Sequence, residues 1–295
     1  MKMLSKIRKI RILSTSDVSR IFPERDISTH KGDYGKVMLL CGSVGYTGAA
    51  ILSAKAACRC GSGLVYLCVP KSIYQIVASQ LSEPVITPLE DNGCGHFIKE
   101  NYEEIKTLLS KMDALLIGPG CGRSDDLLSL VREILAYTDI PVILDADAIN
   151  VFSADPSLLS MHQGPLVLTP HDGEFYRVYR GEKTDRLSEA ICFAIDNNCV
   201  VVRKGYHSLI TDGHIVYQNS SGNPGMAKGG SGDVLSGILL SVLGRNSCIP
   251  FAAACAVFLH GACGDLAAIR LGQEGMLPSD MISFLPYAIR KIKLS

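Results

Sequence analysis

The sequence has no excess of either charge, because 29 lysines and arginines are balanced by 29 aspartates and glutamates. Proteins that bind nucleic acids do so mainly through clustered positive charge. A balanced chain therefore does not indicate a nucleic-acid partner. Long apolar runs are also missing. Apolar runs such as Ala114–Ile117 are far shorter than the roughly 20 residues that cross a bilayer, so we expect no membrane attachment.

The eleven cysteines lack the spacing of a zinc ribbon. No two stand at C-x-x-C spacing, and Cys58 and Cys60 are too close together for a ligand pair. A buried thiol behaves as a small hydrophobe, and several cysteines lie inside apolar runs, namely Cys41, Cys68, Cys199 and Cys255. This usage predicts free thiols in a reducing compartment, the cytoplasm.

The N-terminus lacks the features of a secretory signal. Residues 1–14 are basic, but they have no long apolar core and no small-residue cleavage site. We favour a solvated leader, with an organellar transit peptide as the alternative. No repeat, low-complexity tract or linker interrupts the remainder. We therefore expect a leader over residues 1–29 and a single domain over residues 30–295.

Short apolar runs alternate with longer, more polar, periodic segments. The runs are nearly continuous in Val, Ile and Leu, which is typical of strands buried on both faces of a parallel sheet. The alternation predicts an α/β fold with a mainly parallel central sheet and helices on both faces. Predicted strands are Val37–Cys41, Leu64–Val69, Ala114–Ile117, Val142–Leu144, Leu166–Leu168 and Cys199–Arg203; predicted helices include 101–111, 125–137, 234–243 and 251–269.

Asp212-Gly213-His214 stands between the apolar segments 208–211 and 215–217. An Asp-Gly pair in this setting favours a β-hairpin. We expect the hairpin to add antiparallel strands at one end of the sheet.

Five predicted strands end in glycine or polar clusters. Ligands of open parallel sheets bind at the carboxyl ends of the strands. We therefore expect the five clusters to meet at one edge of the sheet. They are Gly42–Gly48, Gly118–Gly122, Asp145–Asn150, Thr169–Glu174 and Lys204-Gly205.

The strongest local signal is the run Asn223–Leu235, in which three glycines precede an amphipathic helix. Bare backbone can point several N–H groups at a ligand, and a helix N-terminus adds about half a positive charge, so the run predicts an anion site. Asp233 faces that site, where a carboxylate can take a proton from a hydroxyl that attacks a phosphoryl group. A helix N-cap is the alternative role for Asp233, but the glycine density and Lys228 favour catalysis.

Other candidates are weaker. The run is not a P-loop, and Gly61-Ser62-Gly63 is only a fragment of a dinucleotide fingerprint. His171 stands just after a predicted strand, which favours a functional role over a structural one. Asp145 and Asp147 would face the same side of an extended segment and could organise a metal or hydroxyl groups, or cap the next helix. Lys204-Gly205 could line a nucleotide pocket or form a plain turn.

In combination, these motifs resemble the NAD(P)H-hydrate dehydratase family of the ribokinase-like superfamily. The resemblance extends from about His30 to about Leu285, and its motifs occur in the family's order. The matching segments are Gly42–Ala49, Gly61–Val65, Gly118–Gly122, Leu144–Asn150, Thr169–Glu174, Lys204-Gly205 and Asn223–Leu235.

The resemblance implies repair of NADH or NADPH whose nicotinamide ring has been hydrated. ADP or ATP would phosphorylate the ring hydroxyl, and loss of phosphate would restore the double bond. Asp233 would be the base, with Gly230 and Gly232 in the catalytic nest. The implied substrate-binding residues are Ala49, Gly120, Gly122, His171 and Asp233. The implied nucleotide-binding residues are Lys204, Gly205, Tyr206, His207, Ser208, Asn223, Gly229, Ser231 and Gly232.

The resemblance also implies Mg²⁺ as cofactor, without a protein cage that the sequence would reveal. We favour ADP over ATP as the phosphoryl donor. A homo-oligomer is implied, with a tetramer as one candidate. Many relatives carry a fused epimerase domain, and only about 30 residues precede the resemblance here. We therefore expect the epimerase to be a separate chain.

Two positions depart from the family pattern. Asp172 stands where the family usually has proline, in His171–Glu174. Lys228 stands where the family usually has threonine, and it would add a cation near the phosphates. Two other functions compete with the dehydratase. One is a kinase of the same superfamily acting on a thiazole or pyrimidine alcohol, and the other is a non-catalytic nucleotide sensor. Gly42–Ala49 and Thr169–Glu174 favour the dehydratase over the kinase, and a sensor would tolerate loss of Asp233.

Overall fold

The structure is a computed structural model that describes residues 10–295, so residues 1–9 of the predicted leader lie outside it. In the described part, ten strands form one sheet in the order β1-β10-β9-β8-β7-β6-β5-β2-β3-β4. The strands are β1 (Ile10–Arg11), β2 (Lys36–Leu40), β3 (Leu64–Pro70), β4 (Val85–Leu89), β5 (Ala114–Ile117), β6 (Val142–Leu144), β7 (Leu166–Leu168), β8 (Val200–Arg203), β9 (Leu209–Thr211) and β10 (Val216–Gln218).

The sheet from β8 to β4 is parallel throughout. At its other end, β9 runs antiparallel to both β8 and β10, and β1 joins β10 in parallel. The predictions of a mainly parallel sheet and of an antiparallel hairpin at one end are both confirmed.

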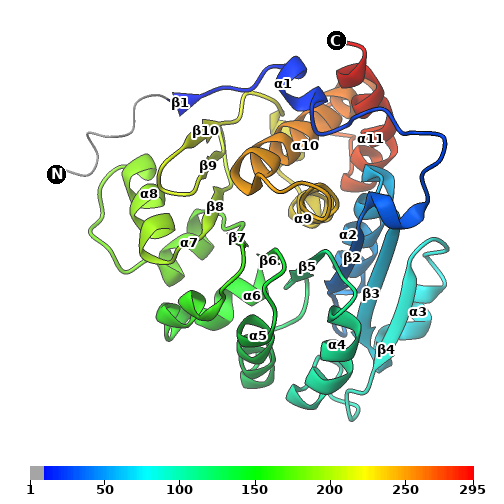
Figure 1. Ribbon diagram of the computed structural model, residues 1–295, viewed down its shortest axis with the longest axis vertical. Coiled ribbons are helices and arrows are strands. Elements are labelled where there is room, and N and C mark those ends of the chain that lie inside the picture. The colour runs from blue at the N-terminus through cyan, green and yellow to red at the C-terminus, as the bar shows by residue number, and fades with distance from the viewer. Residues whose placement is uncertain (1–9) are drawn as a thin grey trace.

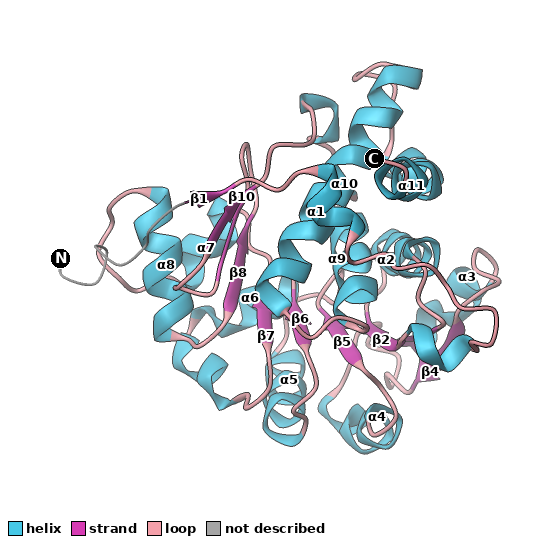
Figure 2. Cartoon of the chain, turned by 45° about the horizontal axis from the view of Figure 1, so that its top comes forward, coloured by secondary structure: helices cyan, strands magenta, loops and turns pink. Residues whose placement is uncertain are grey.

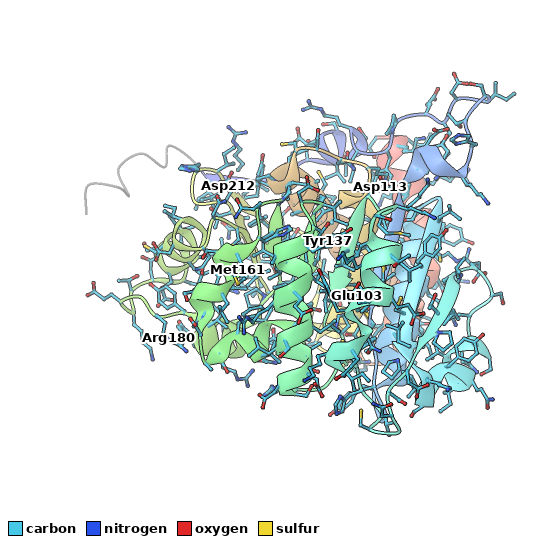
Figure 3. All side chains as sticks on the ribbon, turned by 60° about the horizontal axis from the view of Figure 1, so that its bottom comes forward. Glu103, Asp113, Tyr137, Met161, Arg180 and Asp212 are labelled. Carbon is cyan, nitrogen blue, oxygen red and sulfur yellow. The ribbon has the colours of Figure 1, made fainter. Side chains whose placement is uncertain are left out.

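Helices cover both faces of the sheet, as predicted (Figures 1 and 2). On one face, α9 packs against α2 and α10, and α11 packs against α2 and α10. Figure 3 shows the other face, with Glu103 on α4 and Tyr137 at the end of α5. The helices are α1 (Thr15–Ser19), α2 (Thr47–Cys60), α3 (Tyr74–Ala78), α4 (Tyr102–Leu109), α5 (Asp125–Tyr137), α6 (Asp147–Asn150), α7 (Asp172–Val178), α8 (Arg186–Asp196), α9 (Ser231–Leu243), α10 (Ile249–Leu271) and α11 (Pro278–Lys293).

The central strands are apolar at every position because both of their faces are buried. In β2, Val37 and Leu39 belong to the core that α2, α9 and α10 cover, whereas Met38 and Leu40 belong to the core beneath α4 and α5. All four side chains are fully buried. A charge introduced at any of them would lack solvent and a partner, so this layer tolerates only apolar side chains.

Two strands were missed by the sequence reading. β4 contains Pro88, and proline is usually confined to edge strands because it cannot donate to the ladder. β4 is indeed the last strand of the sheet. β1 has only two residues, and it lies in the predicted leader. Residues 10–29 nevertheless pack on the domain, because Val18 and Ile21 of this segment join the core.

α10 is the one helix within residues 10–295 that is long and apolar enough to cross a membrane, by length and composition alone. In its most apolar stretch, 61% of the residues are buried inside the protein. It packs against α9 and α11. These contacts are those of a core helix.

Candidate active site

The loops after the central strands meet at one edge of the sheet, as their composition predicted. The N–H of Gly42, after β2, donates to the carbonyl of Pro119, after β5, and the N–H of Asp145 donates to Ile117. His171, after β7, forms a β-bridge with Lys204, after β8. At Gly118, φ is 126°, and a Cβ atom would lie 1.8 Å from the carbonyl oxygen of Asp145. Glycine is required there because two strand ends touch.

The N-terminus of α9 forms the predicted glycine nest. Gly230 is the N-cap, with φ of 97°, a conformation that side chains disfavour. The hydroxyl of Ser231 donates to the carbonyl of Met226, 2.6 Å away, and the ring of His260 lies 3.0 Å from the carbonyl of Ser231. Both contacts fix the start of the helix.

Asp233 is the third residue of α9, so the alternative role of N-cap is excluded. Within residues 10–295 its carboxylate receives no hydrogen bond, whereas its backbone carbonyl accepts one from Ser53 of α2 at 3.0 Å. Burial, together with the negative charge of Asp145, raises the pKa of Asp233 to about 7, although Lys204 opposes the rise. A base with a pKa near neutrality is well matched to proton abstraction at physiological pH.

Asp145 is near enough to Asp233 for its charge to raise the pKa of Asp233, and its own carboxylate is held by three side-chain donors. Its carboxylate accepts hydrogen bonds from Thr169 at 2.7 Å, Ser236 at 2.7 Å and Lys204 at 2.9 Å. Burial alone would raise its pKa, but the ammonium of Lys204 and the two hydroxyls outweigh burial and lower it. Asp145 therefore stays ionised and holds Lys204 in place.

The expectation that Asp145 and Asp147 face the same side of an extended segment is wrong. Ala146 between them has φ of 50° and ψ of −113°, and Asp147 is the first residue of α6. Asp147 accepts the N–H of Gly122 at 2.9 Å. Asp145 accepts the hydroxyls of Thr169 and Ser236, and Asp147 is the first residue of α6, whose N-cap is Ala146.

Three of the predicted substrate residues lie together. A Cβ atom on Gly120 would lie 2.9 Å from that of Ala49, so the glycine loop after β5 rests on the first turn of α2. Gly122 is fixed through Asp147. Ala49 lies one helical turn before Ser53, which holds the backbone of Asp233. The substrate residues and the base are thus connected through α2.

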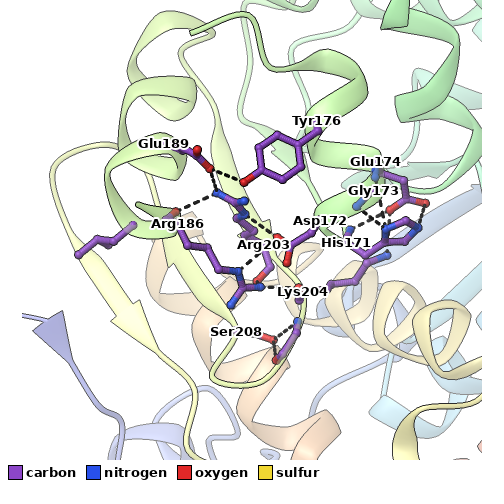
Figure 4. A network of polar contacts seen from close by, with 12 residues as sticks. His171, Asp172, Gly173, Glu174, Tyr176, Arg186, Glu189, Arg203, Lys204 and Ser208 are labelled. Atoms are coloured by element: carbon purple, nitrogen blue, oxygen red, sulfur yellow. Dashed lines mark hydrogen bonds and ion pairs between the residues drawn. The ribbon is translucent and has the colours of Figure 1, made fainter. Parts of the chain in front are cut away.

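His171 caps α7, the helix that follows β7. Its Nδ1 accepts the N–H groups of Gly173 at 3.0 Å and Glu174 at 3.3 Å, and the Glu174 carboxylate in turn accepts the N–H of His171. Its side chain is 55% exposed, and its Nε2 lies 3.4 Å from Glu174. The capping fixes the ring and leaves it open to a ligand (Figure 4).

The predicted nucleotide residues fall into separate groups. Lys204 extends its side chain away from its own turn, toward Asp145 and Glu174, and its Nζ lies beside Gly232. Asn223 accepts the N–H of Gly225 and donates to Asp265, so both ends of its amide are used within the protein. The other predicted residues are the turn Gly205–Ser208 and the nest residues Gly229, Ser231 and Gly232.

The two departures from the family pattern have definite partners. Lys228 donates to the carbonyls of Glu274 and Met276, both at 2.6 Å, so its ammonium is bound to the loop before α11. The hypothesis of a cation placed beside the phosphates is not supported by this geometry. Asp172 accepts the guanidinium groups of Arg203 at 2.8 Å and Arg186 at 3.2 Å.

Several residues of the site were missed by sequence reasoning. Ser236, one turn into α9, donates its hydroxyl to Asp145, and His260 comes from the distant helix α10. Arg203 forms a buried ion pair with Glu189, in which each side chain is only 1% exposed. The one sequence feature that could have revealed this ion pair is the charged Arg203 at the end of an apolar strand.

A family model for NAD(P)H-hydrate dehydratase matches residues 37–287. The chain belongs to the NAD(P)H-hydrate dehydratase family. The bifunctional NAD(P)H-hydrate repair enzyme Nnr of Moorella thermoacetica is 39% identical over 289 residues, covering 96% of this chain and 54% of that protein. The enzyme of the same name from Coxiella burnetii is 34% identical over 93% of this chain and 54% of its own. The chain spans about half the length of these curated relatives.

Solved structures of the dehydratase family agree with this assignment. The ADP/ATP-dependent NAD(P)H-hydrate dehydratase of Bacillus subtilis, co-crystallised with ATP and Mg²⁺, has a TM-score of 0.83 and 28% identity, covering 97% of this chain and 99% of that one. A ribokinase-like superfamily protein of Enterococcus faecalis has a TM-score of 0.85 and 25% identity over 98% of both chains. The predicted family and the ribokinase-like fold are confirmed.

Proposed function

We propose that this chain dehydrates hydrated NADH and NADPH, of the S epimer, in a nucleotide-dependent reaction. The observation that carries the proposal is Asp233, whose carboxylate receives no hydrogen bond from residues 10–295 and has a pKa of about 7, in the first turn of the helix that follows the glycine run. Family membership and the agreement of fold with a dehydratase that was crystallised with ATP and Mg²⁺ support it.

In the first step, the ring hydroxyl of the substrate gives its proton to Asp233 while its oxygen attacks the terminal phosphoryl group of the nucleotide. The O–P bond that forms replaces the bond to the leaving nucleotide, so ADP yields AMP and ATP yields ADP. In the second step, phosphate leaves with the electron pair of the C–O bond, and loss of a proton from the adjacent ring carbon restores the double bond. The N–H groups of the nest would stabilise charge on the transferring phosphoryl group.

The proximity of Lys204 to the first turn of α9 supports a phosphoryl site there. Lys204 Nζ lies beside Gly232, at the first turn of α9. We propose that Ala49, Gly120, Gly122 and His171 hold the hydrated dinucleotide. We propose that the turn Lys204–Ser208, with Asn223, holds the nucleotide.

We propose that Mg²⁺ arrives bound to the nucleotide. The described residues, 10–295, contain no group of three or more His, Cys, Asp or Glu side chains arranged to hold a metal ion. Mg²⁺ usually takes one or two carboxylates together with phosphate oxygens and waters. An ion carried on the phosphates fits this donor set better than a resident ion does. When bound, it would neutralise charge on the phosphates.

The test is recovery of dihydronicotinamide absorbance in the near ultraviolet. The purified chain is mixed with hydrated NADH and with ADP or ATP in separate reactions, and phosphate release is followed in parallel. We expect recovery with ADP, one phosphate for each molecule restored, and slower recovery with ATP. Absence of recovery with either nucleotide would refute the proposal, and phosphorylation of a thiazole alcohol by the same sample would favour the small-molecule kinase.

We further propose a cytoplasmic enzyme that forms a homo-oligomer and acts on the hydrate epimer that an epimerase activity supplies. All eleven cysteines lie within the described residues and are free, which supports a reducing compartment. The named relatives are bifunctional repair enzymes. Light scattering would measure the oligomeric mass. The same assay on a mixture of hydrate epimers would reveal whether this chain consumes both, and we expect it to leave one epimer behind.

A further inference from the structure

Arg186, the first residue of α8, reaches over the turn that follows β8. Its Nη2 donates to the carbonyl of Lys204 at 2.5 Å and to that of Arg203 at 3.2 Å, and its Nη1 donates to the carbonyl of Tyr206 at 3.2 Å. Figure 4 shows the guanidinium between α8 and the turn. One side chain thus holds the end of β8 and two carbonyls of the Lys204–Ser208 turn, the segment proposed to bind the nucleotide.

Asp172 holds Arg186 from the opposite side. Its Oδ1 accepts Arg186 Nε at 3.2 Å and Arg203 Nε at 2.8 Å. Arg203 is in turn fixed by buried Glu189 at 2.8 Å, to which Tyr176 also donates at 2.9 Å. These contacts therefore fix the orientation of the Arg186 guanidinium. Asp172 is also the position at which this chain departs from the family's proline.

The turn has a shape that depends on this contact. Gly205 has φ of 147°, and a Cβ atom on it would lie 2.6 Å from Arg186 Nη2, so glycine is needed to admit the guanidinium. His207 has φ of 52°, a conformation that is costly for a non-glycine residue and persists only where neighbours enforce it. Ser208 Oγ closes the turn through the N–H and carbonyl of Gly205, at 3.2 and 2.9 Å.

The occupied carbonyls decide what the turn can offer a ligand. Arg186 already donates to two carbonyls of the turn, those of Lys204 and Tyr206. Among residues 10–295, no protein acceptor takes the backbone N–H groups of Tyr206 and His207, and the side chain of Tyr206 is 88% exposed. The turn therefore presents donors and an aromatic ring, while the carbonyls of Lys204, Gly205, Tyr206 and Ser208 already accept hydrogen bonds within the protein. This pattern suits an anionic ligand that carries a planar base.

We propose that Arg186, oriented by Asp172, is a positioning residue that preorganises the Lys204–Ser208 turn for the nucleotide. The inference rests on the proposed function, in which this turn binds ADP or ATP. Water could satisfy the same carbonyls if the turn were free to move, so the clamp's contribution is to fix the turn's shape before the ligand arrives. Ordering a binding loop in advance increases affinity because the ligand no longer bears that entropy cost.

The test compares three variants of the full chain. Arg186→Gln removes the clamp. Asp172→Pro restores the family's residue and removes the orienting carboxylate; proline is tolerated at the first position of a helix, and His171 before it is already extended, with ψ of 169°. Arg180→Gln is the control, because Arg180 also binds three carbonyls, those of Ser153, Arg177 and Tyr179, outside this turn (Figure 3).

Binding of ADP and of ATP is measured by calorimetry, and kcat and KM by the absorbance assay. We expect Arg186→Gln to raise the Kd and KM for nucleotide about tenfold, with kcat and the KM for hydrated NADH within twofold of wild type. Asp172→Pro should raise the nucleotide Kd and KM about threefold, and Arg180→Gln should leave both unchanged.

Unchanged nucleotide affinity in Arg186→Gln, or an equal loss in Arg180→Gln, would overturn the inference and leave the proposed function standing. Failure of the wild-type chain to bind either nucleotide would overturn both. If Arg186→Gln does not fold, Asp172→Pro becomes the test of the inference. Wild-type nucleotide affinity in Asp172→Pro would then refute the positioning role of Arg186.

Discussion

Two carboxylates at the same edge of the sheet have opposite properties. Asp145, at the end of β6, is more deeply buried, yet its pKa is lowered. Asp233, at the start of α9, is only partly buried, yet its pKa is raised to about 7. Asp145 receives three side-chain donors, while Asp233 receives none from the described residues, 10–295.

The difference teaches that the charged and hydrogen-bonding partners of a buried carboxylate decide whether burial raises its pKa. Burial penalises the ionised form in both cases, but donors that favour the charged form can outweigh it. Asp145 is stabilised as an anion and serves as a fixed charge. Its charge then raises the pKa of the second carboxylate nearby, which makes Asp233 the better proton acceptor near neutral pH.

The largest expected effect is on turnover in Asp233→Asn. The amide cannot accept the hydroxyl proton, so we expect kcat to fall by about 10³ or more, with ADP binding retained in calorimetry. Asp212→Asn in the β9–β10 hairpin is the matched control and should keep wild-type kcat (Figure 3). Near-normal turnover in Asp233→Asn would refute the role of base.

The next effect is on stability in Asp145→Ala. Removing this carboxylate leaves the ammonium of Lys204 buried without its closest partner, and breaking a buried pair typically costs about 3–5 kcal/mol. We expect a loss of that size in the free energy of unfolding, measured with urea. The double variant Asp145→Asn with Lys204→Met should lose much less. Equal losses in both variants would show that the pair contributes little.

A smaller effect is the pH dependence of stability that Asp233 causes. Its pKa is raised from 3.8 to about 7 on folding, so its favourable contribution is complete below pH 3.8 and is lost as pH rises through 7. Asp233→Asn should therefore be more stable than wild type by roughly 2 kcal/mol at pH 8, after allowance for solvent screening, and equal to it near pH 4. Parallel stability curves from pH 4 to 8 would contradict this account.

The smallest effect is expected for Lys228→Ala. Its ammonium is bound by the carbonyls of Glu274 and Met276, so it is not available to a phosphate group. We expect KM for ADP and for ATP to stay within twofold of wild type in the absorbance assay, with a loss of stability of about 1 kcal/mol. A tenfold rise in either KM would restore Lys228 as a nucleotide contact.

The sequence predicted the central strands and their functional ends because each carries a local signal. Continuous apolar runs mark β2, β5 and β6, and the glycines before Asp233 mark the nest. β1 and β4 were missed because one has two residues and the other contains Pro88. The contacts of Arg186 with Asp172 and with the turn after β8 could not be predicted. They join α7, α8 and the end of β8 through side chains that are far apart in the sequence and follow no periodic pattern.

The two carboxylates can be compared most directly by NMR titration of ¹³C-labelled aspartate carboxyl groups. Asp145→Asn and Asp233→Asn would assign the two signals in the full chain. We predict that Asp233 titrates near pH 7, while Asp145 stays ionised below the ordinary range of an aspartate. An Asp233 signal that titrates near pH 4 would contradict the claim that this carboxylate is set apart as the base.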